Sequence, residues 1–477
     1  MGFLGFTNFS ELVLFFTSIV SGMVILLGLN AVNATPPFML EYYKYIKHDE
    51  HAVSDYPNFW RNVLTYYCIV TEVTQAVLQP VNLLPFFRRF SYLFRLELGC
   101  MISMMELLIT LLMPHIGASE SGAVVGILMA AFVGGLGRAI FENTVFALFG
   151  TCPPKIIIGA MIGVPASGVL MSVLQIILIG CMPSNFKSVF KQSIIYFSIG
   201  IGLITVSVLL LILLFFNKFA KGFIPELRST RSAWRNIYRP LKLSEELPQN
   251  DPSKISLKNE HGSTHEAGND ATSSPQLDIF ATTDSEPKKQ SSSPQDDTNI
   301  DPEGLISTEL LQRVRLWDVI KKIYTMQIAC FLNFFVTLLI FPGVFLKINF
   351  TDIWYTTLVI AIFNFTDFIS RGVLIWKKLR ISRKMVLILS IARIALIPLV
   401  ILCGMHIIPG KMPGYILSGI LGISNGYVGT LSMMYAPTSP GLRGNGDHAM
   451  AAQACDGALM LGCSLGALSQ LGVVLAF

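Results

Sequence analysis

Charged side chains are scarce in this chain. Asp, Glu, Lys and Arg make up 14% of its 477 residues, whereas 52% of the residues are hydrophobic. Ordinary soluble domains carry about 25% charged residues. A chain so poor in charge is typical of a polytopic membrane protein. The net charge of +5 is small and its bases gather at loop ends, which gives no indication of nucleic-acid binding.

Ligand sets for metals and sets for covalent catalysis are also missing. The eight cysteines lie in or at the ends of apolar runs, with no CxxC spacing and no His at ligand spacing. We interpret them as small buried side chains, not as disulfides or metal ligands. No nucleophile with a base, and no metal cluster, appears in the cytoplasmic loops predicted below. We therefore expect no enzyme activity, no cofactor and no metal.

Long apolar runs are what the chain has instead. A run of roughly 20 apolar residues is long enough to cross a bilayer as a helix. Eleven such runs occur, near residues 12–40, 59–86, 92–113, 121–150, 155–181, 190–217, 316–346, 353–376, 384–407, 413–435 and 448–475. The sequence therefore predicts an all-α polytopic membrane protein with eleven transmembrane helices and with its termini on opposite sides.

Basic residues in alternate connections predict the orientation, because cytoplasmic loops are enriched in Lys and Arg. The connections after the second, sixth and eighth runs are the basic ones, with Arg88, Arg89 and Arg95, then Lys218, Lys221, Arg228, Arg231, Arg235, Arg239 and Lys242, then Lys377, Lys378, Arg380, Arg383 and Lys384. Lys44, Lys47 and Arg61 in the first connection run against the pattern. We expect a cytoplasmic amino terminus and an extracellular carboxyl terminus.

One long segment has a different composition from the rest. Residues 243–305 are rich in Ser, Pro, Asn and Asp, and contain thirteen acids against four Lys. Such a segment is predicted to be disordered. It divides the chain into an expected six-helix bundle at 1–217, a cytoplasmic linker at 218–315 and a five-helix bundle at 316–477. No internal sequence repeat supports the two-bundle division.

The most unusual apolar run holds an amide, an acid and a base. Asn364, Asp367 and Arg371 lie three and four residues apart, so they share one face of a helix. An unpaired Asp or Arg at the centre of a membrane helix costs roughly 2.5 to 3.5 kcal/mol on insertion scales. This polar stripe therefore faces protein or water, as an ion pair or as a binding site.

A second acid and base lie in the fourth run. Arg138 and Glu142 are four residues apart, and Gly134, Gly135 and Gly137 precede them. The glycines allow a close helix approach or leave room for a ligand. We weigh two interpretations equally: the pair neutralises itself, or Glu142 has a substrate or proton role.

Three further charges lie within apolar runs. Glu72 and Glu106 have no evident partner in the sequence, and each is either a proton carrier or, more often, a protonated hydrogen-bond donor. Arg393 is expected to form a structural ion pair with an acid on a neighbouring helix.

Charges near helix ends have simpler expected roles. Arg95 and Glu97 are expected to reach the membrane interface or to pair there. Asp447 and His448, with Asp456 further along the same run, are expected to form a cytoplasmic gate or a helix cap.

Several motifs resemble the equilibrative nucleoside transporter family. They are Phe363-Asn364-x-x-Asp367-x-x-x-Arg371, Ser424-Asn425-Gly426-Tyr427 with Tyr435-Ala436-Pro437, Pro165-x-Ser167-Gly168-Val169, and Arg393. They occur in the family's order and cover nearly the whole membrane part. Pro36-Pro37-Phe38, Glu41-Tyr42-Tyr43-Lys44-Tyr45, Phe59-Trp60 and Thr65-Tyr66-Tyr67 resemble the trypanosomatid branch.

The resemblance implies a major-facilitator-like fold of two bundles and alternating access for nucleosides or nucleobases through a central cavity. It places Asp367 and Arg371, with Asn364, at the substrate. Two positions depart from the family pattern: Thr35 stands where many relatives have Trp, and Glu142 where they have Gln. Thr35 and Glu142 are also expected at the substrate. Thr35 puts stacking on the substrate in doubt, and Glu142 adds a titratable acid at this position.

These observations together predict a monomeric plasma-membrane transporter for purine nucleosides or nucleobases. Glu142, Arg138, Glu106, Glu72 and Arg393 are the candidates for proton coupling or gating, and protons are the expected coupling partner. Two alternatives stay open. One is a transporter for nucleobases alone, and the other is a transporter-like receptor or sensor that binds purines.

Overall fold

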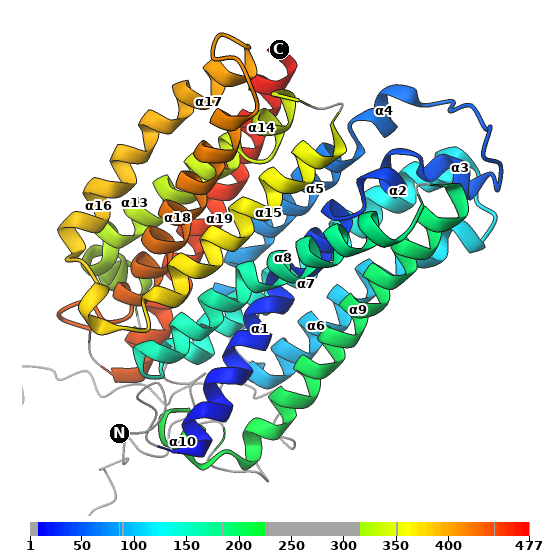
Figure 1. Ribbon diagram of the computed structural model, residues 1–477. Helices are drawn as coiled ribbons and strands as arrows, with labels where there is room; N and C mark the ends of the chain where they lie inside the picture. The colour runs from blue at the N-terminus through cyan, green and yellow to red at the C-terminus, as the bar shows by residue number, and fades with distance from the viewer. Residues whose placement is uncertain are drawn as a thin grey trace, which may run out of the picture. The chain divides into compact units, whose positions relative to one another are not determined.

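The protein is described by a computed structural model, which covers residues 8–84, 86–87, 90–183, 185–224, 227, 315–349, 352–442 and 444–476. The acidic segment 243–305, predicted to be disordered, lies outside the described residues. We use "N-terminal half" for residues 8–224 and "C-terminal half" for residues 315–476. In Figure 1 the helices of each half lie together, with those of the N-terminal half in blue to green.

Six long helices make up most of the N-terminal half: α1 (Phe9–Asn33), α5 (Val63–Leu78), α6 (Tyr92–Leu112), α7 (Glu120–Gly150), α8 (Pro154–Cys181) and α9 (Phe186–Leu213). The shorter elements are α2 (Pro36–Leu40), α3 (Tyr42–Ile46), α4 (Pro57–Arg61), α10 (Lys218–Phe223) and the 3-10 helices η2 (Gln79–Leu83), η4 (Met113–His115) and η5 (Leu214–Phe216).

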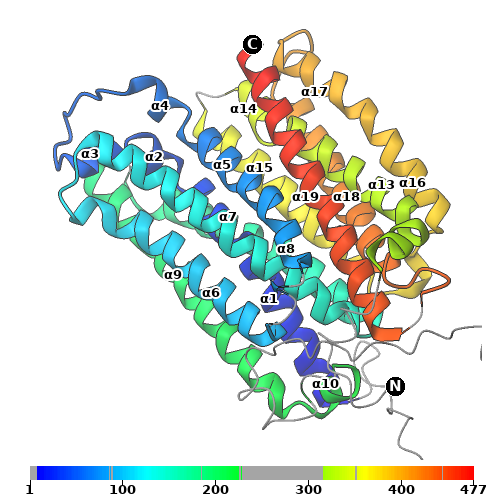
Figure 2. The ribbon, with the colours of Figure 1, turned by 180° about the vertical axis from the view of Figure 1, so that it is seen from behind.

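The C-terminal half has the same kind of architecture. Its helices are α13 (Leu316–Ile340), α14 (Gly343–Lys347), α15 (Ile353–Val373), α16 (Arg383–Ala392), α17 (Leu396–Gly404), α18 (Met412–Tyr435) and α19 (Gly444–Ala476), with the 3-10 helices η9 (Lys377–Leu379) and η10 (Arg393–Ala395). The first turn of α1 and the last turn of α19 lie at opposite ends of the helices, as Figures 1 and 2 both show.

Local residue chemistry explains where several helices begin. The Ser119 hydroxyl accepts a hydrogen bond from Gly122 N at 3.2 Å and caps α7. The Asp352 carboxylate accepts from Trp354 N at 2.9 Å and caps α15. Such side chains satisfy backbone N–H groups that have no partner inside the helix.

Prolines explain two differences from the predicted helices. The first run, predicted to extend to residue 40, breaks because α1 ends at Asn33 and α2 begins at Pro36. Proline has no N–H and disfavours helical geometry at the preceding residue. The ninth run is divided into α16 and α17 by the 3-10 turn Arg393–Ala395. Pro398 lies just after this turn and cannot donate to the carbonyl of Ile394.

Eight helical stretches in the described part of the chain are long and apolar enough to cross a membrane: Phe9–Asn33, Tyr92–His115, Glu120–Gly150, Pro154–Cys181, Phe186–Phe216, Leu316–Lys347, Arg383–Gly404 and Gly444–Val474. Three long helices, α5, α15 and α18, are not among these eight. Helix α5 has 16 residues, and α15 carries the polar stripe. The chain is therefore an all-helical, multi-pass membrane protein.

Glycines allow α1 and α8 to pack with their backbones in contact. A Cβ built on Gly163 would lie 2.0 Å from the carbonyl oxygen of Ile19, and one on Gly22 would lie 2.0 Å from that of Ala160. No side chain fits at either position. Small residues at such crossings are typical of membrane helices.

A buried acid at the start of α7 holds the segment before α5. Glu120 Oε1 accepts from Ser54 Oγ at 2.7 Å and from the Trp60 indole N–H at 2.9 Å. Lys47 Nζ lies 2.7 Å from Glu120 Oε2, and this hydrogen bond raises the pKa of Lys47. Glu120 therefore anchors residues 47–60 to the end of the N-terminal half that carries α2, α3 and α4.

Candidate functional site

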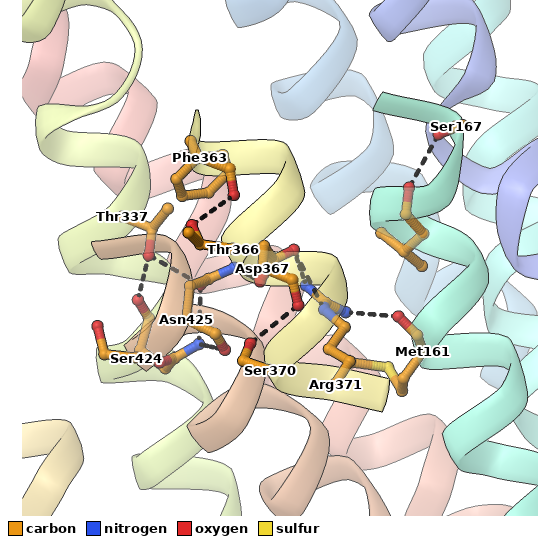
Figure 3. Close-up of polar contacts among 12 residues, drawn as sticks. Met161, Ser167, Thr337, Phe363, Thr366, Asp367, Ser370, Arg371, Ser424 and Asn425 are labelled. Carbon is orange, nitrogen blue, oxygen red and sulfur yellow. Dashed lines mark hydrogen bonds and ion pairs between the residues drawn. The ribbon is translucent and has the colours of Figure 1, made fainter. Parts of the chain in front are cut away.

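The polar stripe of α15 forms a buried ion pair. Arg371 Nη2 and Nε donate to Asp367 Oδ2 at 2.9 and 3.2 Å, as the four-residue spacing predicted. Asp367 is 3% exposed and Arg371 2%. Figure 3 shows both side chains in the interior, with Arg371 directed from α15 toward α8.

Arg371 also connects the two halves of the chain. Its Nη1 donates to the backbone oxygen of Met161 on α8 at 3.0 Å. About two turns earlier in α15 and about three turns later in α8, Asn364 Nδ2 donates to the Ser172 hydroxyl at 3.1 Å. A Cβ on Gly168 would lie 2.7 Å from the Asn364 amide. The predicted substrate residues of α15 therefore lie at its contact with α8.

Asn425 of α18 is a further hydrogen-bond donor to Asp367. Its Nδ2 donates to Asp367 Oδ1 at 3.0 Å, and its own Oδ1 accepts from the Thr337 hydroxyl of α13 at 2.9 Å. In the sequence, Asn425 stands out only as part of the motif Ser424-Asn425-Gly426-Tyr427. The sequence feature that could have identified it as a site residue is an amide side chain within an apolar run.

Arg393 does not form the predicted ion pair. Its guanidinium donates to Asn333 Oδ1 and to the Thr337 hydroxyl, both on α13, and no acid lies within 4.0 Å of it in the described residues. Asp367 is the acid whose charge acts on it from a longer distance. The ion pair was expected from charge alone, whereas neutral oxygens on α13 take its hydrogen bonds.

The second acid and base of the sequence also have different partners from those predicted. Arg138 Nη1 lies 3.5 Å from Glu72 Oε1 of α5, and both are buried. No hydrogen bond or ion pair joins Arg138 to Glu142 in the described residues; instead Glu142 Oε2 accepts from Gln75 Nε2 at 2.5 Å. Mutual neutralisation of Arg138 and Glu142 was therefore wrong, because Arg138 pairs with Glu72, an acid on the neighbouring helix α5.

Glu106 occupies a space that two glycines leave open. A Cβ on Gly28 of α1 would lie 2.4 Å from its Oε2, and one on Gly134 of α7 would lie 2.2 Å from its Cδ. The hydroxyl of Tyr67 donates to Glu106 Oε1 at 2.5 Å. Glu106 is thus a hydrogen-bonded acid at the meeting of α1, α5, α6 and α7, near Arg138.

Asp456 was expected in a cytoplasmic gate or a cap near the start of α19. It is instead 0% exposed, and Gln79 Nε2 and Asn143 Nδ2 donate to its Oδ2, the latter at 3.3 Å. Both donors belong to the N-terminal half. His448 lies apart from this set, with its Nδ1 2.5 Å from the backbone oxygen of Pro437.

Two other residues have partners that the sequence did not indicate. Thr35 lies between α1 and α2, and its hydroxyl donates to Val32 O at 3.1 Å and to Ala31 O at 3.3 Å in the last turn of α1. Arg95, expected at the membrane interface, is 0% exposed and donates to Asn82 Oδ1 at 3.1 Å. Thr35 therefore caps a helix, and Arg95 is an interior residue.

The arrangement suits reversible binding of a polar solute. Asp367 and Glu142 present hydrogen-bond acceptors and Arg371 presents donors, within an otherwise apolar interior. No group of three or more His, Cys, Asp or Glu residues with metal-ligand geometry occurs in the part of the chain that the structure describes.

Comparison with known proteins points in the same direction. A family model described as nucleoside transporter matches residues 127–475. Nucleoside transporter 1.2 of Leishmania donovani is 32% identical over 97% of this chain and 93% of its own length. Nucleoside transporter 2 of Crithidia fasciculata is 34% identical over 99% and 96%.

The fold has a solved counterpart among the major facilitators. The proton:xylose symporter XylE, bound to 6-bromo-6-deoxy-D-glucose, matches 96% of this chain with a TM-score of 0.55 and covers 87% of its own chain, at 10% identity. This similarity supports the major-facilitator-like architecture and nothing about substrate. Together with the match over residues 127–475 and the full-length relatives, it shows that the chain is a membrane transporter of the equilibrative nucleoside transporter family, and not an enzyme.

Proposed function

We propose that the protein carries purine nucleosides or nucleobases across the plasma membrane by alternating access. The observation that carries the proposal is the buried Asp367–Arg371 pair, which contacts α8 of the other half through Met161 O. A buried charge pair is weak evidence for stability, because desolvation offsets most of its attraction. Its position between the halves favours a binding role.

The proposed chemistry of recognition follows from donor and acceptor types. The Asp367 carboxylate accepts from ribose hydroxyls or from ring N–H groups, and the Arg371 guanidinium donates to purine or ribose oxygens and nitrogens. Asn364, on the same helix face, and Glu142, on α7, supply further polar groups. Binding exchanges the present hydrogen bonds for hydrogen bonds to the substrate, and this exchange keeps the free-energy cost of breaking them low. Adenosine transporter 1 of Crithidia fasciculata, 31% identical to this chain, supports a purine substrate.

The proposed topology has eleven membrane crossings in a six-plus-five arrangement. Helices α5, α15 and α18 supplement the eight apolar stretches, their polar residues being turned toward other helices as Asp367, Glu72 and Asn425 are. Residues 218–315 form the cytoplasmic linker, the amino terminus is cytoplasmic and the carboxyl terminus extracellular. The protein is proposed to act as a monomer and to couple uptake to protons.

Uptake of radiolabelled purines tests the proposal, in cells that lack their own purine carriers. We expect saturable uptake of adenosine or inosine, and competition of hypoxanthine uptake by inosine. Failure of inosine to compete with hypoxanthine would favour a nucleobase-only transporter. Binding without counterflow would favour a receptor. Absence of uptake of adenosine, inosine, hypoxanthine and guanine by well-expressed protein would contradict the proposal.

A further inference from the structure

Asp456 is a buried acid that the proposed recognition chemistry does not use. It lies in α19 of the C-terminal half, with its carboxyl group 0% exposed. Its hydrogen-bond donors, Gln79 of η2 and Asn143 of α7, belong to the N-terminal half. The carboxyl group is therefore held between the two halves.

No cation in the described part of the chain forms an ion pair with this acid. Among the described residues, no Lys, Arg or His forms an ion pair with Asp456 or with Glu142, the acid next to Asn143 on α7. An ionised carboxylate buried without a counter-ion costs several kcal/mol, and such groups take up a proton instead. Two acids that face one another increase this tendency, because like charges disfavour the second ionisation.

The surroundings hold more acids than bases. The titratable and charged groups nearest to Asp456 and Glu142 are Glu72 on α5, Arg138 on α7, Arg371 on α15, Cys330 on α13, and Cys455 and Cys463 on α19. Arg138 lies 3.5 Å from Glu72 and Arg371 lies 2.9 Å from Asp367. Both bases are thus engaged by other acids.

The amides around Asp456 give a second, independent indication that its carboxyl group binds a proton. Gln75 Oε1, Gln79 Oε1, Asn143 Oδ1 and Asp456 Oδ1 are all buried and have no hydrogen-bond donor. Buried acceptors are normally satisfied, and each one that lacks a donor destabilises the fold. The set has an excess of acceptors and lacks a donor. A proton on a carboxyl oxygen supplies an O–H donor at this place.

We propose that Asp456 is a proton-binding site, which is coupled to Glu142 and carries the proton that moves with the substrate. In the protonated form its O–H donates to the surrounding amide oxygens. The carboxylate takes one proton from water on one side of the membrane and releases it to water on the other, so that charge and atoms balance. This inference rests on the proposed transport function and names the residue that couples it to protons.

The position between the halves explains how proton binding and conformation are linked. Hydrogen bonds to a carboxylate favour its charged form, and here both donors come from the other half. Movement of α19 away from η2 and α7 removes them. The proton affinity of Asp456 therefore differs between conformations, which is the condition for a proton to shift the conformational equilibrium.

The test uses purified full-length protein in liposomes with a pH gradient of one unit, acid outside. One proton moved per neutral nucleoside gives wild-type accumulation of about tenfold, since one pH unit corresponds to a factor of ten. Asp456→Asn, which keeps the size and one oxygen of the side chain, is expected to give about onefold accumulation while still exchanging labelled for unlabelled nucleoside. A pH dye inside the liposomes is expected to report no substrate-driven proton entry for this variant.

Ser464→Ala is the matched control. It removes another bond between α19 and α5, Ser464 Oγ to Glu72 O at 2.8 Å, without removing a titratable group. It is expected to retain the tenfold accumulation. Asp456→Asn with tenfold accumulation and substrate-driven proton entry would overturn the proposal, as would wild-type accumulation driven by a sodium gradient instead of a proton gradient. Wild-type protein without any nucleoside exchange would refute the transport function itself.

A second variant keeps the test decisive if Asp456→Asn does not fold. Gln79→Met removes a donor to Asp456 at nearly constant volume. Loss of a bond to the charged form favours the protonated form, so half-maximal uptake is expected at a higher pH than in wild type. An unchanged pH profile in folded Gln79→Met protein would contradict the proposal.

Discussion

The clearest energetic prediction concerns the unequal roles of Asp367 and Arg371. The carboxylate of Asp367 faces two guanidinium groups, Arg371 at 2.9 Å and Arg393 at a longer distance. Guanidinium groups stay protonated in proteins. Asp367→Asn therefore leaves two buried positive charges without a counter-ion, whereas Arg371→Leu leaves one negative and one positive charge.

The structure gives a magnitude for each change. Removing one partner of a buried ion pair typically costs 3 to 5 kcal/mol in the free energy of unfolding. We expect Asp367→Asn to cost about 5 kcal/mol and Arg371→Leu about 3 kcal/mol. The double variant removes the pair together, so its cost is expected to be smaller than the sum of the single costs by at least about 2 kcal/mol.

Denaturant titration of purified protein in mixed micelles measures these free energies. Thr366→Val on the same helix is the control, because its hydroxyl donates, among the residues that the structure describes, only to Ile362 O and Phe363 O of α15. It is expected to change the unfolding free energy by less than about 1 kcal/mol. An Arg371→Leu variant less stable than Asp367→Asn, or additive single costs, would refute the reasoning.

The same variants separate a binding role from a structural one. Both single variants are expected to abolish uptake while protein still reaches the cell surface. The double variant recovers stability, and we expect it to remain inactive because neither ligand group is present. Recovery of uptake in the double variant would show that the two side chains only hold each other.

Three further predictions address other parts of the fold. Glu120→Ala leaves the Trp60 indole N–H without its acceptor. We expect faster proteolysis within residues 47–60 of detergent-solubilised protein and a free energy of unfolding lower by about 1 to 3 kcal/mol. Unchanged cleavage would contradict the anchoring role. Gly163→Val places a side chain against the backbone of α1 and is expected to prevent recovery of monodisperse protein by size-exclusion chromatography. The control is Gly180→Ala on the same helix, where no atom lies within 4 Å of the added Cβ, and it is expected to behave as wild type. Tyr67→Phe removes the donor to Glu106. We expect the free energy of unfolding, measured by denaturant titration, to fall by about 1 to 3 kcal/mol. Equal stability would show that Glu106 has another donor.

Contacts within one helix could be predicted from the sequence. Asp367 and Arg371 lie four residues apart, and the periodicity of a helix places such side chains side by side. The same argument made Asn364 a neighbour of this stripe. Its contact with Ser172 depends on the crossing of α15 and α8, which no spacing in the sequence reveals.

Contacts between helices account for the incorrect predictions. Arg138 and Glu142 have the same four-residue spacing as Asp367 and Arg371, yet Arg138 pairs with Glu72 on α5. Spacing shows which side chains are able to meet, whereas the packing of neighbouring helices decides which partner is nearer. Asp456 illustrates the same limit, because its two donors lie more than 300 residues away in the sequence.

Counterflow measures the central claim most directly. Proteoliposomes containing purified wild-type protein are loaded with unlabelled adenosine or inosine, and entry of the labelled nucleoside is followed. We predict a transient overshoot of label above its equilibrium level, which is absent with Asp367→Asn and present with the control Thr366→Val. Absence of an overshoot with folded wild-type protein, or an equal overshoot with Asp367→Asn, would contradict the assignment of this buried cluster as the binding site of a nucleoside transporter.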